Sequence, residues 1–259
     1  MGAAGNWRRN WCRGHLHWRL FGYDCISLSA KHRVLMMMQE QAKQEICDAI
    51  RILVTAGIMD YNGHASLRID DTTFLINSGG SNRAAMEMSQ ISIADTAGQL
   101  VAGERLPNEV FLHAEIYKAR PDVKALLHCH PNWSTLLNAC SQSIPCVMPQ
   151  GALVADLPLY KHSHSISSAA RGVDLADCLG VNCGAYLLNH GVVFVGQELK
   201  EPVCRAIYAE QNAERVYRSL SLGGANPLPD ATKREYAKTL ANPALYKKCW
   251  DFFLTQRTN

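Results

Sequence analysis

The sequence predicts an α/β fold, a three-layer α/β/α sandwich around a mainly antiparallel sheet. Short strand-like segments follow one another closely between residues 64 and 94, which is typical of antiparallel pairing. Segments with helical periodicity stand before them, between the later strands and after them. The chain has 259 residues, of which 47% are hydrophobic and 19% are charged, so it can bury a sizeable core.

The first regular element is expected to be a helix that follows an N-terminal extension. Residues 1–33 mix tryptophan, glycine and arginine without a clear period, and we expect this extension to be poorly ordered. A helical period begins at Leu35 and ends near Gly57, since glycine suits the end of a helix. We therefore place one domain at residues 34–224, with a C-terminal helical tail at residues 225–259 packed on it.

The order of the remaining elements follows from turn residues and periodicity. The Ser-Gly-Gly turn at residues 78–80 separates strand-like segments, and Pro107 suits the first turn of a helix whose apolar positions share one face. Strands are expected at residues 64–70, 73–77, 90–94, 123–129, 184–189 and 192–195. Helices are expected at residues 107–119, 134–140, 167–179 and 199–220, with one or two more after Pro227 and Pro229.

Composition and charge exclude several classes of function. The formal charge of +3 includes no basic stripe within the expected domain, so we expect no nucleic-acid partner. No run approaches about 18 consecutive apolar residues, so we expect no membrane insertion. The ten cysteines form no closely spaced pairs and are expected to be reduced thiols, which favours the cytoplasm. A small molecule is the partner that remains.

The pair His128 and His130 is the strongest local indication of chemistry. Residues two apart in a strand project from the same face, so both imidazoles are directed to one place. Neutral imidazole suits zinc, manganese or iron, and three protein ligands with an open position are typical of a catalytic metal site. The alternative is two histidines that form local hydrogen bonds at a strand end.

His190 and Glu109 are the candidates to complete this site. His190 follows an apolar strand and precedes a glycine, at a strand end where the backbone turns sharply. Glu109 is expected in the first turn of the helix that begins at Pro107, where the helix dipole favours a carboxylate as ligand or base. His64 and the His162/His164 pair compete with His190 as ligands or contact the substrate instead.

Several motifs taken together resemble the class II aldolase/adducin family. The resemblance covers roughly residues 38–222 and keeps order and spacing. It implies the α/β/α fold, a metal held by His128, His130 and His190, Glu109 as acid/base, and a homotetramer with its sites near subunit interfaces. The motifs are Pro107-Asn108-Glu109 with His113 and Tyr117, Arg120-Pro121-Asp122-Val123, His128-Cys129-His130-Pro131 and Asn189-His190-Gly191.

Departures from the family pattern bear on the substrate. Gly63-His64-Ala65-Ser66 stands where the family's phosphate-binding turn has asparagine after glycine, and Pro107-Asn108 replaces paired serines. The Gly-His turn and the Pro-x-Glu-x-x-x-His helix resemble the decarboxylase branch. This resemblance implies removal of carbon dioxide from a hydroxylated aromatic or pyridine carboxylic acid. Substrate contacts are expected from His64, Ser78, Gly79, Asn108 and His164.

Two alternative functions and the identity of the metal stay open at this point. The family also contains aldolases and epimerases that act on a sugar or sugar phosphate, such as L-fuculose 1-phosphate, through an enediolate. A non-catalytic adducin-like module is disfavoured because the three histidines and Glu109 are retained. One divalent metal per chain is expected, zinc first, with manganese or iron as alternatives; an iron oxygenase would use the same ligands.

Overall fold

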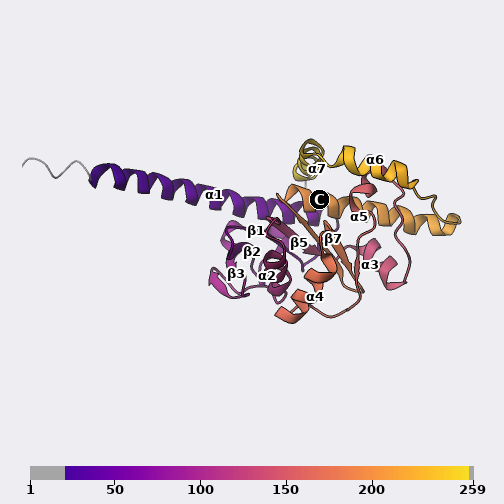
Figure 1. Ribbon diagram of the computed structural model, residues 1–259, viewed down its shortest axis with the longest axis horizontal. Coiled ribbons are helices and arrows are strands. Elements are labelled where there is room, and N and C mark those ends of the chain that lie inside the picture. The colour runs from indigo at the N-terminus through magenta and orange to yellow at the C-terminus, as the bar shows by residue number, and fades with distance from the viewer. Residues whose placement is uncertain (1–20, 257–259) are drawn as a thin grey trace, which may run out of the picture. The chain divides into compact units, whose positions relative to one another are not determined.

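The protein is described by a computed structural model that covers residues 21–256 (Figure 1). The expectation for residues 1–20 lies outside the described residues. The chain divides into a unit up to Gln41 and a compact unit from Ala42 onwards. Within the described part, no helix is long and apolar enough to cross a membrane. The compact unit contains every strand, and α1 (Phe21–Thr55) spans the division.

Helix α1 begins earlier than its sequence periodicity indicated. We expected a helix from Leu35, whereas the helix already starts at Phe21, within the segment that we expected to be poorly ordered. No proline lies between Phe21 and Thr55, and Gly22 is the one glycine there, so nothing in the backbone chemistry breaks the helix. Hydrophobic periodicity detects burial, and Val34 and Met36–Met38 are exposed.

Eight strands form one mainly antiparallel sheet, as predicted. Their order is β4-β3-β2-β1-β5-β8-β7-β6, and β6 with β7 is the parallel pair. The edge strands β4 and β6 were not predicted, because they have three and two residues and too few positions to show alternation. The bounds are β1 His64–Arg68, β2 Thr73–Asn77, β3 Ile91–Asp95, β4 Leu100–Ala102, β5 Ala125–Cys129, β6 Leu159–Tyr160, β7 Gly184–Leu187 and β8 Gly191–Gly196.

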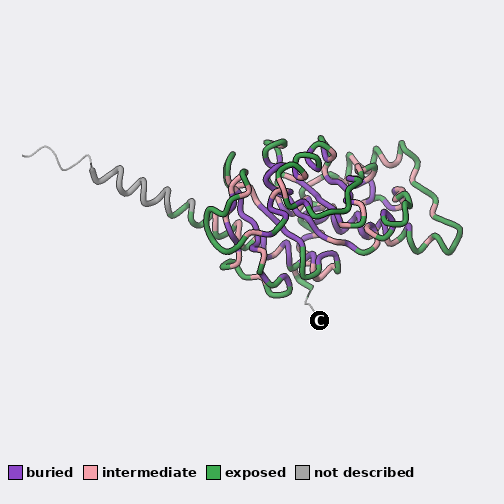
Figure 2. The backbone as a smooth tube through the Cα atoms, turned by 90° about the horizontal axis from the view of Figure 1, so that it is seen from below, coloured by how far each residue is buried: buried purple, intermediate pink, exposed green. Residues whose placement is uncertain are grey.

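Helices cover both faces of the sheet and make the three layers. Residues 42–55 of α1, together with α5 and α7, share one hydrophobic core with the sheet, and α2 and α4 share the other. Figure 1 shows α5 and α4 on opposite sides of the strands, and Figure 2 shows the buried residues running between the exposed ones. The helices are α2 Val110–Ala119, α3 Asn132–Ala139, α4 Ala169–Leu179, α5 Lys200–Ser219, α6 Asp230–Leu240 and α7 Pro243–Thr255.

Strand β5 lies at the centre of the sheet and alternates between the two cores. Ala125, Leu127 and Cys129 face the core of α1, α5 and α7, whereas Leu126 faces the core of α2 and α4. His128 follows the same alternation as Leu126 and is therefore directed towards α2. The strand pairs with β1 and β8, so its backbone is held on both sides.

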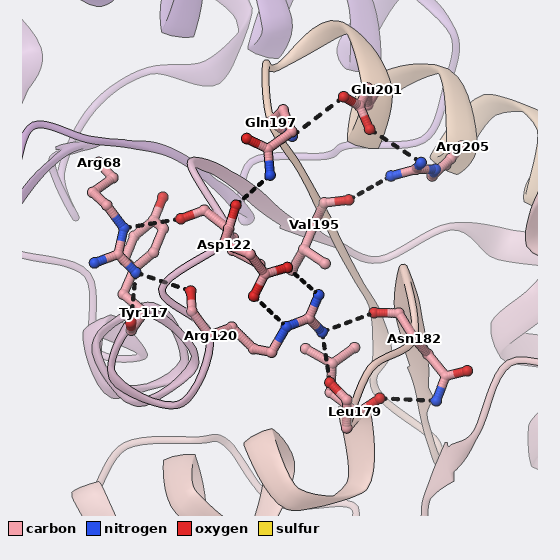
Figure 3. A network of polar contacts seen from close by, with 12 residues as sticks. Arg68, Tyr117, Arg120, Asp122, Leu179, Asn182, Val195, Gln197, Glu201 and Arg205 are labelled. Carbon is pink, nitrogen blue, oxygen red and sulfur yellow. Dashed lines mark hydrogen bonds and ion pairs between the residues drawn. The ribbon is translucent and has the colours of Figure 1, made fainter. Parts of the chain in front are cut away.

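A polar network holds the first residues of β5, at the end of the strand that lies away from His128 (Figure 3). Arg120 donates two hydrogen bonds of 2.8 and 2.7 Å to the Asp122 carboxylate and one to the carbonyl of Asn182. Gln197, which directly follows β8, donates a side-chain hydrogen bond to the carbonyl of Asp122, and its backbone N–H donates to the Glu201 carboxylate of α5. The network joins α2, β5, β8 and α5 at the end of β5 opposite to its histidines.

Candidate metal centre

Four side chains from three places in the fold meet at one point. His128 lies in β5, His130 directly follows it, His190 lies in the turn between β7 and β8, and Glu109 precedes α2. Each offers one ligating atom, and these atoms all lie within 4.8 Å of one another. The structure thus brings together the four residues that the sequence singled out.

Close packing at the turn between β7 and β8 determines where His190 stands. Gly191 follows it, and a Cβ atom at this glycine would collide with the carbonyl of Cys129. Asn189 has a left-handed backbone with φ of 54°, a conformation that asparagine tolerates better than most residues. The tight turn and the close approach of β8 to β5 together place the His190 ring beside the His128 and His130 rings.

The chemistry and spacing of the four donors fit a divalent metal ion. The Nε2 atoms of His128 and His130 are 3.1 Å apart, and the Glu109 carboxylate lies 3.3 Å from His128 Nε2 and 3.5 Å from His190 Nε2. Three imidazole nitrogens and one carboxylate oxygen form a usual donor set for zinc, manganese or iron. His128 is fully buried, so bulk water does not compete for its ring.

Contacts behind the histidines decide which ring nitrogen faces the centre. The Nδ1 atom of His128 lies 2.9 Å from the carbonyl of Val192, which leaves Nε2 for the centre. The Nδ1 atom of His130 lies 3.6 Å from the Asp60 carboxylate. The Nδ1 atom of His190 is buried without a partner in the described chain. Asp60 was not singled out, because a lone aspartate in a loop has no recognisable pattern.

Glu109 stands just before α2, and the 165–166 segment holds its carboxylate. We expected it in the first turn of a helix starting at Pro107; instead α2 starts at Val110, and Pro107 and Glu109 belong to the preceding turn. The side chain does not cap the helix. Its Oε1 atom accepts hydrogen bonds of 2.9 Å from the Ser165 hydroxyl and the Ile166 amide. The Oε2 atom faces His128, and Oε1 also lies 3.5 Å from His190 Nε2.

Burial and mutual charge set the protonation states of the cluster. Burial, together with the proximity of His128, lowers the pKa of His130 and of His190 to about 4. Burial by itself would raise the pKa of Glu109, but its hydrogen bond to His128 and the nearby imidazoles outweigh this and hold the pKa well below its usual range. At neutral pH His130 and His190 therefore stand as neutral imidazoles and Glu109 as a carboxylate, the forms that bind metal.

Three of the four side chains, Glu109, His130 and His190, border a cavity of about 580 Å³, and His128 lies buried behind them. His64, Gly79 and Asn108, which we expected to contact a substrate, line it together with Glu109, His130 and His190. Ser78 and His164 are not among the lining residues. The lining residues that the sequence did not single out are Asn62, Arg83, Arg105 and Ser165, while Pro107 and Asn189 were noted as members of the family motifs.

The turn at residues 78–80 is held by bonds within the protein. The Ser78 amide donates to the Gln90 carbonyl and its hydroxyl to Glu104, over 2.8 and 3.1 Å. The Gly79 amide donates to the Arg105 carbonyl over 2.7 Å. Both backbone donors that we expected to serve the substrate are therefore engaged already.

The two histidines expected to meet a substrate carboxylate lie in different surroundings. His64 opens β1, is 6% exposed, stacks on its cross-strand partner His128 and has a buried Nδ1 atom without a partner in the described chain. His164 is exposed on the loop before α4 and stacks on His162. His64 is thus a wall of the cavity, whereas His164 is outside its lining.

A family model agrees with this fold and site. The model described as the class II aldolase and adducin N-terminal domain matches residues 44–217. This range includes all four residues of the cluster and every strand of the sheet.

Curated relatives and solved structures are similar over most of the chain. A 3,4-dihydroxyphthalate decarboxylase of Arthrobacter keyseri is 28% identical over 211 residues, which are 75% of this chain and 85% of the relative. A 3-oxo-tetronate 4-phosphate decarboxylase of Haemophilus influenzae is 26% identical over 164 residues, 60% and 76% of the two chains. An L-fuculose 1-phosphate aldolase of Glaciozyma antarctica superposes with a TM-score of 0.75 at 20% identity, covering 85% and 89%.

Proposed function

Because this chain belongs to the class II aldolase and adducin family, we propose that it is a divalent-metal-dependent carbon–carbon lyase. More specifically, we propose a decarboxylase of a hydroxylated aromatic or pyridine carboxylic acid. The observation that carries the proposal is the convergence of His128, His130, His190 and Glu109 at one point, beside a cavity that three of them line. The similarity to two kinds of decarboxylase supports the choice of reaction.

In this proposal His128, His130 and His190 hold the metal. When bound, a divalent ion supplies Lewis acidity towards the hydroxyl and carboxylate oxygens of a substrate. Each of the three imidazoles offers one ring nitrogen as a ligand, and the Val192 carbonyl behind His128 keeps that ring in its orientation. The cavity beside them gives the substrate its access.

Glu109 moves the proton that the reaction requires. Its ionised carboxylate accepts the proton of a substrate hydroxyl at Oε2, since Oε1 is occupied by Ser165 and Ile166. The bond from ring carbon to carboxylate then breaks, carbon dioxide leaves, and the electron pair stays on the carbon. Glu109 returns its proton to that carbon, and the product leaves as a phenolate that takes a proton from water. The carboxylate is thereby regenerated.

An aldolase acting on a sugar or sugar phosphate is the second candidate. The same residues would serve, with Glu109 taking a proton from a substrate hydroxyl as a carbon–carbon bond breaks. The similarity in fold to L-fuculose 1-phosphate aldolases supports this candidate. Pro107 and Asn108 lack the hydroxyl groups that paired serines offer a phosphate, and this favours the decarboxylase.

A non-catalytic interaction module is the least favoured candidate. The human beta-adducin is 31% identical over 114 residues, which are 44% of this chain and 16% of the relative. An interaction module has no need of four metal-binding side chains at a cavity, and all four are present here.

We further propose zinc as the metal, a homotetramer with its sites near subunit interfaces, and a cytoplasmic location. Zinc suits three imidazoles with a carboxylate or an open position. The described cysteines are free, in keeping with a reducing compartment. Multi-angle light scattering of the purified protein tests the tetramer, and elemental analysis tests the metal.

The proposed function is tested by metal content and carbon dioxide release together. Wild type is expected to hold about one metal per chain and to release carbon dioxide from hydroxylated aromatic diacids. The His128→Ala/His130→Ala variant should lose both. Glu109→Gln should keep the metal and lose roughly 10²-fold or more in kcat, because it cannot transfer the proton. Metal binding without carbon dioxide release would direct the search to aldol substrates. Failure to bind metal under any reconstitution would refute the proposal that the chain is a metal-dependent enzyme.

A further inference from the structure

Two arginines line the cavity and neither has a carboxylate partner. Arg83 and Arg105 form no ion pair within the described part of the chain. Glu109 is the one carboxylate among the lining residues. With neutral histidines the lining residues carry one net positive charge, and a bound divalent ion adds two more. The net positive charge of the cavity therefore suits a substrate with more than one anionic group.

Arg83 is a buried cation that is held in place by backbone oxygens. The residue is 4% exposed, and its Nε atom donates to the Gly63 carbonyl over 3.0 Å. Its Nη1 atom donates to the Ser78 carbonyl and to Ser81. The Nη2 atom has no partner among the described residues. Burying an unpaired guanidinium is costly, and an anion in the cavity would offset that cost.

The position of Arg83 is tied to the metal centre through the backbone. Its acceptor Gly63 packs against the carbonyl of His128, since a Cβ atom at Gly63 would lie 3.0 Å from that oxygen. Burial lowers the pKa of Arg83, and among the described residues Asp60 opposes this; its carboxylate is half exposed and faces His130. Arg83 is thus built rigidly into the wall beside the centre.

Arg105 lines the same cavity and is also bonded to the 78–80 turn. Its carbonyl accepts the Gly79 amide, so its backbone is fixed, whereas its side chain is exposed and has no polar partner in the described chain. A fixed backbone with a free guanidinium suits a residue that closes on an anion. The two arginines flank one turn and face one cavity.

We infer that Arg83 and Arg105 form an oxyanion-binding subsite for the anionic group that the substrate keeps after it has lost carbon dioxide. This inference rests on the proposed function and specifies its substrate as a compound with at least two anionic groups. One group reacts at the metal centre, and the arginines bind the other. A ring carboxylate and a phosphate ester share this chemistry.

The test measures binding of two unreactive probes to the zinc-loaded protein by titration calorimetry. Catechol and 3,4-dihydroxybenzoate differ by one carboxylate. Wild type is expected to bind 3,4-dihydroxybenzoate at least about tenfold more tightly, as for a charge-assisted hydrogen bond. Arg105→Gln should reduce this preference below about threefold and leave the affinity for catechol unchanged. Arg234→Gln, which removes an exposed cation from α6, should behave as wild type.

Further measurements distinguish a phosphate from a carboxylate as the bound group, and the failure of the subsite from the failure of the proposed decarboxylase function. Displacement of 3,4-dihydroxybenzoate by inorganic phosphate in wild type but not in Arg105→Gln identifies a phosphate as the natural group; no displacement identifies a carboxylate. Arg83→Lys should also weaken the preference, and if it fails to fold, Arg105→Gln decides alone. Equal binding of both probes by wild type overturns the inference even if carbon dioxide is released. A preference that depends on Arg105, without carbon dioxide release, refutes the decarboxylase alone.

Discussion

At the scale of single residues, Asp60 is the side chain whose effect on the metal centre is most readily isolated. Its carboxylate lies 3.6 Å from His130 Nδ1 and is half exposed, so it orients the ring without being a ligand. We predict that Asp60→Asn weakens zinc binding by about tenfold, the lower end for such outer partners. Competition with a chromogenic chelator measures this. Asp71→Asn, at an exposed loop position, is the matched control, and equal affinities in all three proteins would contradict the role.

His113 is a second residue with a measurable consequence, in this case for stability. Its Nδ1 atom lies 2.7 Å from the Ser66 hydroxyl, which lies 2.7 Å from the Tyr117 hydroxyl. Burial, helped by His128, lowers the pKa of His113 to about 3. Between pH 6.5 and pH 3 the unfolded chain therefore binds a proton that the folded chain does not. Hence the free energy of unfolding falls as the pH falls through this window.

We predict that His113→Gln removes this part of the pH dependence. Glutamine can still bond Ser66 but does not titrate. The difference in free energy of unfolding between wild type and variant should therefore fall, as the pH is lowered, by up to about 1.4 kcal/mol per pH unit. Urea denaturation of the metal-free proteins at pH 7, 6 and 5 measures the difference. Parallel pH profiles would show that His113 is not the titrating group.

At the scale of elements, helix α3 depends on a carboxylate from another helix. Glu210 of α5 is buried and accepts hydrogen bonds from the amides of Trp133 and Ser134 over 2.6 and 3.1 Å, at the N-terminus of α3. The helix begins at Asn132, directly after His130 and its proline, so this cap also supports the histidine pair. No N-capping side chain of the helix itself does this work.

We predict that Glu210→Gln lowers the free energy of unfolding by about 1–3 kcal/mol, because it removes a charged acceptor and buries an amide donor. Chemical denaturation at neutral pH measures the loss. Glu214→Gln, one turn later on the exposed side of α5, removes an ion pair with Arg218 and should cost about 0.5 kcal/mol or less. Equal losses in the two variants would mean that the cap is unimportant.

At the scale of the whole molecule, a metal bound at the cluster would tie together elements far apart in sequence. Its proposed ligands come from β5, from the turn between β7 and β8 and from the residue before α2. We predict that zinc at 100 times its Kd stabilises the fold by about 2.7 kcal/mol, which raises the Tm by roughly 5–10 °C. Thermal unfolding with and without a chelator measures this. The same shift in His128→Ala/His130→Ala would place the metal elsewhere.

The sequence by itself determined most of the fold and the four residues of the cluster. Strand alternation directs His128 and His130 to one place, the glycine after His190 marks the turn that follows β7, and the order of the motifs identifies the family. The central strands could be predicted from the sequence because they are long enough for their side chains to alternate between the two cores. Signals of this kind are local, because they depend on neighbours within a few positions.

Only the tertiary structure decided what surrounds the cluster. Arg105 and Asp60 reach the site from loops and Arg83 from a three-residue 3-10 helix, all too short or irregular to show periodicity. Ser165 holds Glu109 across 56 residues of sequence. Whether the amides of the 78–80 turn were free depended on partners in distant segments. Charge balance and hydrogen-bond satisfaction are properties of packed neighbours, so they appear only once the chain has folded.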